Sequence, residues 1–433
     1  MTYSEMKDSG VFWIGKIPSH WHCQRLKYLF AIKKEIAGEL GFTVLSITQQ
    51  GIKPKDMSDR GQFSLDYSKY QLVKPGDFAM NHMDLLTGGV DISKYSGVTS
   101  PDYRVFYSRN PDSICADYYK YVFQVCYRQR IFYGLGQGVA GFGRWRLPAD
   151  MFLNFSLPTP PLQEQIHIAK VLNEQCATID AIVDEAKASI DDYKRWKASV
   201  IHQAVTKGLD PDAPMKDSGI PWFGRLPAHW RITKTLHCLS MAITDGPHTT
   251  PILYDSGVPF ISAEAVSCGN GRIDFTHMRG YISEDFYKEC CKKYIPQIDD
   301  IYMIKSGATT GRVAIVDTDR KFTIWSPLAA FRANRSRISP KFLFYALQSD
   351  SYQKQVELGW TYGTQQNIGM RTLETLKIPL PPLTEQAVIV NFLDGKCSTI
   401  DAIISEKQSL IAELEAYKKS LIYEAVTGKR KVG

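Results

Sequence analysis

The sequence predicts an α+β protein made of two globular blocks, each followed by a long helix. With 433 residues and 44% hydrophobic composition, the chain is too long for one ordinary domain and can bury more than one core. It also repeats itself, and it carries two long heptad patterns. We therefore divide it into a first block at 1–157, a first helix at 158–208, a second block at 209–378 and a second helix at 379–433.

The repeat is visible in two pairs of segments. Residues 6–21 read MKDSGVFWIGKIPSHW and residues 215–230 read MKDSGIPWFGRLPAHW, with ten of sixteen positions identical. PTPPLQEQ begins at Pro158 and PLPPLTEQ begins at Pro379, and each is followed by C-x-TIDAI and then AVT. Matching segments in the same order indicate an internally duplicated chain.

Each helix is predicted by seam positions at alternating spacings of four and three over more than four heptads. A seam of this length favours a coiled coil over a single surface helix. The seam runs from Leu172 to Ala204 in the first helix and from Leu393 to Ala425 in the second. Its main apolar positions are Leu172, Ile179, Val183 and Ile190 in the first helix, and Leu393, Ile400, Ile404, Ile411, Leu414 and Leu421 in the second.

The expected helix ends carry matching signals. Proline pairs ending at Pro161 and Pro382 precede a Glu-Gln pair in the first turn, which is typical of a helix start. Gly208 and Gly428 supply stop signals. Each helix should therefore contain about 44 residues and be roughly 66 Å long.

Lys197 and Lys418 interrupt the seam at equivalent places. The simpler interpretation is that their stems run past Trp196 and Tyr417, so that the ammonium groups reach water. The alternative is a polar position that fixes the register of paired helices at a cost in stability.

The two blocks mix short β-like runs with turns rich in Gly, Pro, Asn and Asp, which favours an α+β architecture. We expect strands at 42–47, 104–107, 121–125 and 313–316, and a helix at 340–348.

Charge and cysteine content narrow the class of protein. The formal net charge is +7, and the excess lies at 1–161 (+5) and 209–382 (+3), which is compatible with a polyanionic partner. The polar start and the lack of an 18-residue apolar run predict neither a secretory signal nor a membrane span. The nine cysteines include the adjacent pair Cys290-Cys291 but no C-x-x-C, and the others are scattered, which indicates reduced thiols in a cytoplasmic protein that binds no metal.

We find no catalytic motif in the sequence. It contains neither the Asn-Pro-Pro-aromatic tetrapeptide of amino-methyltransferases nor an H-E-x-x-H motif. The glycine-rich stretch from Gly307 to Arg312 lacks the spacing and the lysine of a phosphate-binding loop. We therefore expect a chain without enzyme activity and without a cofactor of its own.

Basic, aromatic and amide side chains occur in both blocks in a pattern suited to nucleic acid. Arg pairs with guanine, Asn and Gln pair with adenine, and Ser, Thr and Lys reach phosphates. For any single residue, ordinary solvated surface is the alternative. The candidates are Lys94, Tyr95, Arg104, Arg144 and Arg146 in the first block, and Lys305, Thr309, Thr310, Arg312, Gln365, Gln366 and Asn367 in the second.

The twice-repeated order of block, PPL-x-EQ motif and long helix resembles the specificity (S) subunit of Type I restriction-modification enzymes. The likeness covers essentially the whole chain. Its most specific parts are the segments 158–208 and 379–429, the two DSG-x-x-W-x-G-x-x-P-x-HW segments, and the stretches 307–316 and 364–382.

The resemblance implies that each block is a target recognition domain, which reads one half of a split sequence in double-stranded DNA. The helices would form an antiparallel coiled coil that separates the domains in a pseudo-twofold internal repeat. The end of the second helix would then lie beside the Met6 segment, as the end of the first lies beside the Met215 segment.

The resemblance also implies partners. Two methyltransferase (M) subunits would hold S-adenosylmethionine and methylate adenine, and restriction (R) subunits would use ATP and Mg to translocate and cleave DNA. The chain itself would be a non-catalytic cytoplasmic subunit that does not touch a membrane.

Two alternatives come from other classes of protein. One is a self-contained DNA methyltransferase or nuclease with duplicated DNA-binding domains, and the missing cofactor motif argues against it. The other is a coiled-coil scaffold protein without a role in nucleic-acid binding, which would show no salt-dependent binding to duplex DNA.

Overall fold

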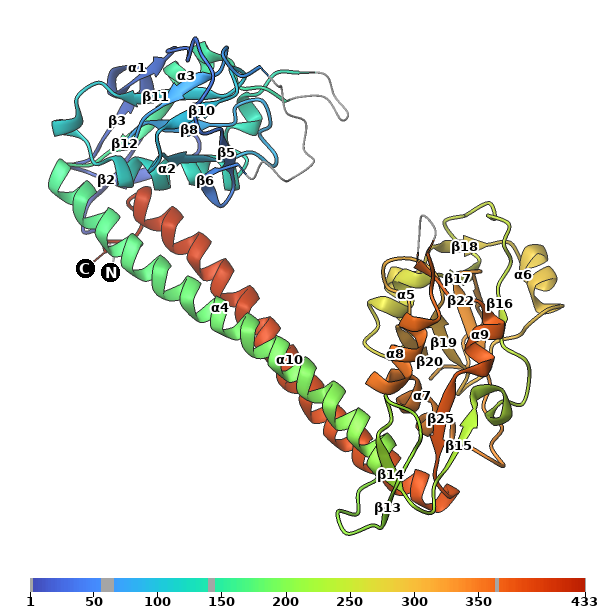
Figure 1. The fold of residues 1–433 in the computed structure, drawn as a ribbon. Helices are drawn as coiled ribbons and strands as arrows, with labels where there is room; N and C mark the ends of the chain where they lie inside the picture. The colour runs from blue at the N-terminus through green and yellow to red at the C-terminus, as the bar shows by residue number, and fades with distance from the viewer. Residues whose placement is uncertain (1–2, 56–65, 139–144, 363–365, 433) are drawn as a thin grey trace. The chain divides into compact units, whose positions relative to one another are not determined.

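The computed structural model describes residues 3–55, 66–138, 145–362 and 366–432. The chain divides into two compact units, one formed by Met1–Ala186 with Gln408–Gly433 and the other by Lys187–Lys407. The first block lies in unit one and the second block in unit two. The two long helices α4 (Leu162–Lys207) and α10 (Leu383–Val426) contribute to both units (Figure 1). We describe each unit by itself.

The first block is mixed α/β with short strands. Its elements are β1 (Met6–Asp8), β2 (Lys16–Pro18), β3 (His22–Arg25), α1 (Leu26–Leu29), β4 (Phe30–Lys33), β5 (Leu45–Thr48), β6 (Gly51–Pro54), β7 (Gln71–Val73), β8 (Phe78–Met80), β9 (Val90–Ile92), β10 (Gly97–Thr99), β11 (Arg104–Ser108), α2 (Ala116–Arg128), α3 (Ala149–Asn154) and β12 (Ser156–Thr159).

The second block is also mixed α/β. Its elements are β13 (Met215–Asp217), β14 (Arg225–Pro227), β15 (Arg231–Lys234), β16 (Thr244–Asp245), β17 (Val258–Ile261), α5 (Ala263–Ser267), β18 (Gly280–Ile282), α6 (Glu284–Cys291), β19 (Ile301–Ile304), β20 (Val313–Ile315), β21 (Thr323–Ile324), β22 (Leu328–Phe331), α7 (Pro340–Gln348), α8 (Asp350–Leu358), β23 (Thr361–Tyr362), β24 (Gln366–Asn367), α9 (Met370–Thr375) and β25 (Lys377–Leu380).

Both blocks contain a four-stranded antiparallel sheet with the same topology. The spatial order is β4-β11-β8-β9 in the first block and β16-β22-β19-β20 in the second. Taken in chain order, each sheet places its first strand beside its fourth, followed by its second and third. The two blocks therefore contain separate sheets of the same topology, although their sequences differ in length and in residues.

Each sheet is buried on both faces. Successive side chains of a strand point to opposite sides, and here they enter two different cores. In the first block, Phe78 and Met80 of β8 join the core that contains α2, whereas Ala79 joins a second cluster with β5, β6 and β7. In the second block, Ile301 of β19 packs toward α7, whereas Tyr302 packs toward α5. This two-sided burial fixes the register of the central strands.

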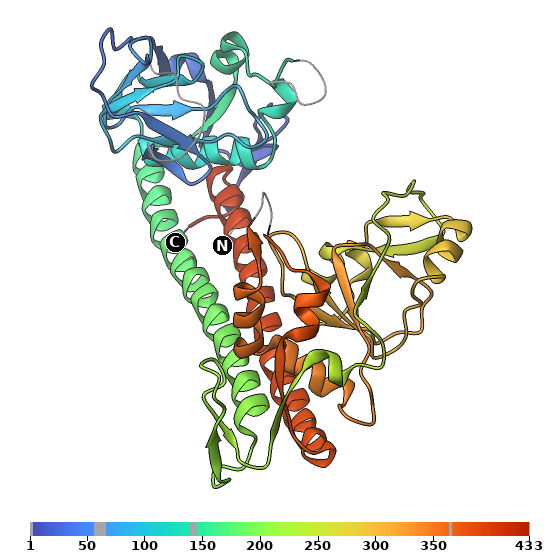
Figure 2. The ribbon, with the colours of Figure 1, turned by 45° about the vertical axis from the view of Figure 1, so that its right-hand side comes forward.

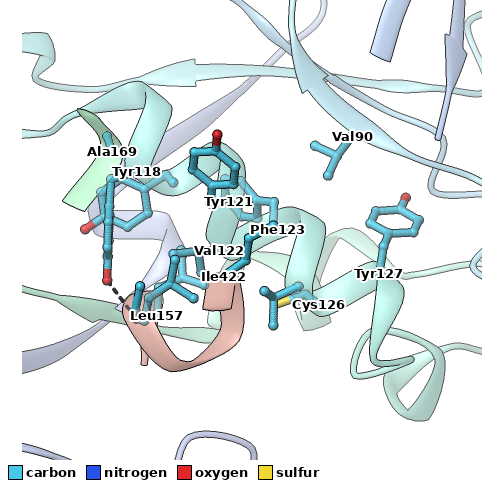
Figure 3. Packing of buried hydrophobic residues seen from close by; sticks show 14 of the residues in the cluster. Val90, Tyr118, Tyr121, Val122, Phe123, Cys126, Tyr127, Leu157, Ala169 and Ile422 are labelled. Atoms are coloured by element: carbon cyan, nitrogen blue, oxygen red, sulfur yellow. Dashed lines mark hydrogen bonds between the residues drawn. The ribbon is translucent and has the colours of Figure 1, made fainter. Parts of the chain in front are cut away.

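The strand predicted at 121–125 is wrong, because these residues lie inside the helix α2. This helix is apolar on two sides, so its sequence looks like a buried strand. Phe123 packs on Phe78 and Phe106 of the sheet, with ring centroids 5.6 and 5.2 Å away. Val122 belongs to the same core as Ala169 of α4 and Ile422 of α10, and Figure 3 shows residues of all three helices around it.

The long helices have the predicted bounds to within a few residues. They begin directly after Pro161 and Pro382. Gly208 and Gly428 follow the last turns with φ of 73° and 71°, in the left-handed region that favours glycine and ends helices. The helix predicted at 340–348 is α7, and the strands predicted at 104–107 and 313–316 are β11 and β20 within one residue. The strand predicted at 42–47 begins three residues before β5 (Leu45–Thr48) and covers all of it except the last residue.

Within each unit, segments of α4 and α10 lie antiparallel. In unit one, the Nζ atom of Lys418 lies 2.6 Å from both carboxylate oxygens of Asp180. In unit two, the Nζ atom of Lys197 lies 2.7 Å from both oxygens of Asp401. Each ammonium therefore pairs with a carboxylate of the other long helix at a site that keeps some contact with solvent, which favours the register-fixing interpretation of the two seam lysines.

The apolar seam positions are largely inaccessible. Those that are buried are Leu172, Ile179, Val183, Ile190, Leu393, Ile400 and Leu421, and those that are half-buried are Ile404, Ile411 and Leu414.

The two repeated motifs meet at the start of each long helix. Glu164 accepts hydrogen bonds from the indole of Trp21 at 3.0 Å and from His20 at 2.9 Å. Glu385 is contacted in the same way by Trp230 at 3.0 Å and His229 at 2.8 Å. The glutamate of PPL-x-EQ therefore ties the HW pair of its own block to the helix.

The glutamine of PPL-x-EQ ties the helix to the rest of the block. Gln165 is 1% exposed; its amide accepts from the backbone N–H of Cys115 at 2.9 Å and donates to the carbonyl of Pro160 at 2.8 Å. Gln386 is 0% exposed and accepts from the N–H of Ser339 at 2.7 Å. A buried amide whose hydrogen-bonding groups have partners fixes the orientation of the start of the helix relative to its block.

The Met6 segment lies against the end of α10, as the resemblance implied. The Lys429 ammonium donates to the carbonyl of Ile14 at 2.7 Å, and the Tyr423 hydroxyl donates to that of Trp13 at 3.4 Å. In Figure 2 the first and last described parts of the chain both lie beside the start of α4. In unit two, Gly208 at the end of α4 packs on Trp230 of the Met215 segment.

Candidate DNA interface

In the second block, the structure brings the described candidate residues together. Lys305, Thr309, Thr310 and Arg312 lie on the connection between β19 and β20, which we call the second-block loop (residues 305–312). Beside it lies the hairpin of β23 and β24, which carries Gln366 and Asn367. The N–H of Gly307 donates to the carbonyl of Gln366 at 3.0 Å, and that of Ile368 donates to Lys305 at 2.9 Å. Gln365 lies outside the described residues.

This loop is ordered by its own hydrogen bonds. The Thr310 hydroxyl donates to the carbonyl of Gly307 at 2.7 Å, and the N–H of Gly311 donates to Ile304 at 2.8 Å. Arg312 is exposed, and one of its guanidinium nitrogens donates to the carbonyl of Ser267 at 3.0 Å. The remaining N–H groups of Arg312, with exposed Gln366 and Asn367 nearby, can meet a base edge or a phosphate.

A buried carboxylate that the sequence analysis missed lies beneath Lys305. Asp245 ends β16 and is 1% exposed; it forms ion pairs with Lys293, with Lys305 at 3.3 Å and with His248 at 3.2 Å. Burial alone would raise the pKa of Asp245, but the hydrogen bond and charge of Lys293 and the charge of Lys305 outweigh it and lower that pKa. Asp245 therefore holds Lys305 in place.

A sequence signal for Asp245 does exist. It is followed by Gly246, where an added Cβ would lie 1.9 Å from the carbonyl oxygen of Ile324. Only glycine permits this close backbone approach, so an Asp-Gly pair after a short strand marks a tightly packed site.

In the first block, the candidates do not form one cluster. Lys94 and Tyr95 are exposed on the connection between β9 and β10. Arg146 is exposed on a strand-like segment whose backbone pairs with Gln137 at 2.8 and 3.0 Å. Arg144 lies outside the described residues.

Arg104 is not a surface residue, and the structure removes it from the set. It is 5% exposed, its guanidinium lies 4.6 Å from the Phe152 ring centroid, and it donates to the carbonyl of Leu147 at 2.9 Å. Burial lowers the pKa of Arg104 to about 10. Its place on the central strand β11 explains the error, because the pattern of a basic residue beside aromatics does not reveal which face is buried.

In the part of the chain that the structure describes, no three His, Cys, Asp or Glu side chains are grouped to hold a metal ion. No helix there is both long enough and apolar enough to cross a membrane.

Comparison with known proteins gives concordant results. The family described as "Type I restriction modification DNA specificity domain" matches residues 252–416. The putative type I restriction enzyme MjaX specificity subunit of Methanocaldococcus jannaschii is 24% identical over 97% of this chain and 96% of its own length. The EcoBI specificity subunit of Escherichia coli is 25% identical over 63% of this chain and 58% of its own.

Solved structures share the fold. A chain from a study of complex assembly and conformational transition of the type I R-M system aligns with a TM-score of 0.68 at 16% identity, over 95% of this chain and 98% of that one. The HsdS subunit of Thermoanaerobacter tengcongensis aligns with a TM-score of 0.50 at 17% identity, over 96% and 98%. The chain is therefore similar in sequence to specificity subunits of Type I restriction enzymes, and similar in fold to these two structures.

Proposed function

We propose that this chain is the sequence-specific DNA-binding subunit of a Type I restriction-modification complex. Each block would read one half of a bipartite target, and partner subunits would methylate adenine and cleave DNA. The observation that carries the proposal is the shared sheet of the two blocks, because a duplicated scaffold with different surface residues suits the reading of two different half-sites. The relatives, all named as specificity subunits, support the same conclusion.

The proposed division of labour gives the chemistry to the partners. S-adenosylmethionine would bind to two M subunits, and ATP and Mg would bind to R subunits, while this chain contributes recognition without catalysis. As a DNA-directed subunit it would work in the cytoplasm. The absence of a catalytic motif from the sequence is consistent with this role.

We propose further that the antiparallel segments of α4 and α10 continue as one coiled coil that sets the spacer between the half-sites. The ion pairs Lys418–Asp180 and Lys197–Asp401 support this. The two residue numbers of each pair have the same sum, as they must when both pairs belong to one antiparallel register. Inserting one heptad into both helices would lengthen the unspecified spacer and leave both half-sites unchanged. An unchanged spacer in such a variant would count against the coiled-coil ruler.

The proposed function is tested by expressing the chain with its M subunits in a host that lacks adenine methylation. Mapping methylated adenine across the genome should return one split sequence that disappears when the chain is omitted. Duplex DNA binding by the assembled complex should fall steeply with salt, since phosphates supply much of the affinity. Methylation that continues without this chain, or an assembled complex that ignores duplex DNA, would refute the proposal.

A further inference from the structure

Because the two sheets have the same topology, each strand and loop of one sheet has a counterpart in the other sheet. In each sheet, the second and third strands in chain order form an edge hairpin: β8 and β9 in the first block, β19 and β20 in the second. The connection between β19 and β20 is the second-block loop, which carries four DNA-binding candidates. Its counterpart is the connection between β8 and β9, which we call the first-block loop (residues 81–89).

The roots of the two loops confirm this correspondence at the level of single hydrogen bonds. The N–H of Leu147 donates to the carbonyl of His82 at 2.9 Å, just as the N–H of Ile368 donates to that of Lys305 at 2.9 Å. Leu147 and Ile368 are both 0% exposed. His82 therefore corresponds to Lys305, and Arg146, which precedes Leu147, corresponds to Asn367.

We propose that the first-block loop, with Arg146 beside it, contacts base edges of duplex DNA in the half-site read by the first block. This inference rests on the proposed function and adds the element of the first block that carries specificity. It moves the expected site away from Lys94 and Tyr95, which lie on the following connection.

The first-block loop is built to present its tip rigidly. The Asp84 carboxylate accepts from the N–H groups of Leu86 and Thr87, both at 3.0 Å, and the carbonyl of Asp84 accepts from the N–H of Gly88 at 3.0 Å. A Cβ at Gly88 would lie 2.1 Å from that carbonyl oxygen, and one at Gly89 would lie 2.4 Å from the carbonyl oxygen of Thr48. A preorganised loop loses little entropy when it binds.

The exposed side chains of this loop have a defined chemistry. Leu86 at the tip is 51% exposed, and Thr87 beside it is also exposed. An apolar side chain held on a rigid loop suits the methyl group of thymine in the major groove. The Thr87 hydroxyl donates to the Asp84 carboxylate, so its oxygen can accept a hydrogen bond from a base. Arg146 supplies a cation for guanine or for a phosphate, so the loop needs no lysine or arginine of its own.

The test uses the complete complex of this chain with its M subunits. Leu86→Gln and Arg146→Ala should each change the bases accepted at positions of one half-site, by roughly tenfold or more at the affected position, with the spacer unchanged. Arg312→Ala on the second-block loop should affect the opposite half-site. Tyr28→Ser is the matched control, because Tyr28 is 66% exposed in the first block but lies on α1, away from both loops in the sequence.

The outcomes separate the inference from the function on which it rests. If the wild-type complex methylates a split site and neither Leu86→Gln nor Arg146→Ala alters a half-site, the inference is wrong and the proposed function stands. Changes that fall in the half-site affected by Arg312→Ala also overturn it. Variants that assemble with unchanged melting temperature and lose methylation entirely support it, provided that Tyr28→Ser stays active. A wild-type complex that methylates no split site removes the proposed function, and the inference with it.

Discussion

The two blocks stabilise sheets of the same topology with a carboxylate at the same position but with different cations. In the first block, Asp77 directly before β8 accepts from the N–H of Lys74 at 2.8 Å and pairs with Lys33 of β4 at 2.7 Å. In the second, Asp300 directly before β19 accepts from the N–H of Gln297 at 2.8 Å and pairs with Arg332 at 2.7 Å. The carboxylate and its turn are the same in both blocks, whereas the cation differs: Lys33 lies on β4, and Arg332 directly follows β22.

The loops of the two blocks differ more than their scaffolds. At the root of the first-block loop His82 is 7% exposed, and at the equivalent position of the second-block loop Lys305 forms an ion pair with Asp245. The first-block loop shows Leu86 and Thr87 to the outside, and the second shows Arg312. Backbone contacts therefore preserve the scaffold, whereas the loop side chains are free to change.

The largest effect should come from the buried carboxylate of the second block. Asp300→Ala leaves the Arg332 guanidinium without its bidentate partner, and we expect the free energy of unfolding of the second block to fall by about 3 kcal/mol. Asp77→Ala should cost less, because Asp77 accepts from the Lys33 ammonium and the Lys74 N–H, whereas Asp300 accepts from two nitrogens of Arg332, the Gln297 N–H and the Tyr294 hydroxyl. Urea unfolding of the full chain measures both, with the exposed Asp285→Ala as control; equal losses would contradict the comparison.

A second difference lies in the pins at the helix starts. Glu164 accepts from Trp21, His20 and the Tyr3 hydroxyl, whereas Glu385 accepts from Trp230 and His229. Replacing a carboxylate by an amide weakens each of these hydrogen bonds, so Glu164→Gln should destabilise its block by about 2 kcal/mol and Glu385→Gln by somewhat less. Tryptophan fluorescence during unfolding reports both changes. A larger loss for Glu385→Gln would show that the third donor contributes nothing.

A third difference concerns pH. Burial, with the charges of Arg104 and Arg146, lowers the pKa of His82 to about 3, against about 6.5 in an unfolded chain. Between these values the unfolded chain binds the extra proton, so stability is complete above pH 6.5 and falls as the pH falls. Between pH 7.5 and 5.5 the first block should lose about 1.4 kcal/mol through this residue. His82→Gln should remove that part of the loss, and His237→Gln on the surface should not.

The smallest effect is expected from a circular permutant opened between Gly208 and Met215, with Gly433 linked to Met1. The end of α10 lies against Ile14 through Lys429, so the new link joins segments that are already neighbours. With its M subunits, the permutant should methylate the same split sequence as the natural chain. A soluble permutant that assembles with M subunits and methylates another sequence, or none, would refute the equivalence of the two repeats.

Local signals in the sequence were sufficient for the long helices and for parts of the blocks. Heptad spacing, paired prolines and two glycines predicted α4 and α10, and the helix predicted at 340–348 is α7. The order of the sheets could not be predicted, because pairs such as β4 with β11 join strands about seventy residues apart and depend on which faces are buried. The sequence also does not show which side of an element is buried. For this reason a segment of α2 was predicted as a strand, and the buried Arg104 was predicted at the surface.

The candidate site was predicted unevenly for a related reason. A search for basic and amide residues found the second-block loop, because Lys305 and Arg312 lie on it. It passed over the first-block loop, whose exposed tip offers Leu86 and Thr87. Only the equivalence of the two sheets reveals that these loops occupy the same position.

The division of the chain into units has a consequence for heredity. Unit two is one uninterrupted stretch, Lys187–Lys407, whereas unit one is assembled from both ends of the chain. Two crossovers in the gene, one within the codons of each long helix, would therefore exchange a complete unit and leave the other intact. Both junctions would fall inside heptads, where a donor sequence of the same phase restores the seam. Under the proposed function, a double crossover of this kind would create a new pairing of half-sites without any point mutation in either block.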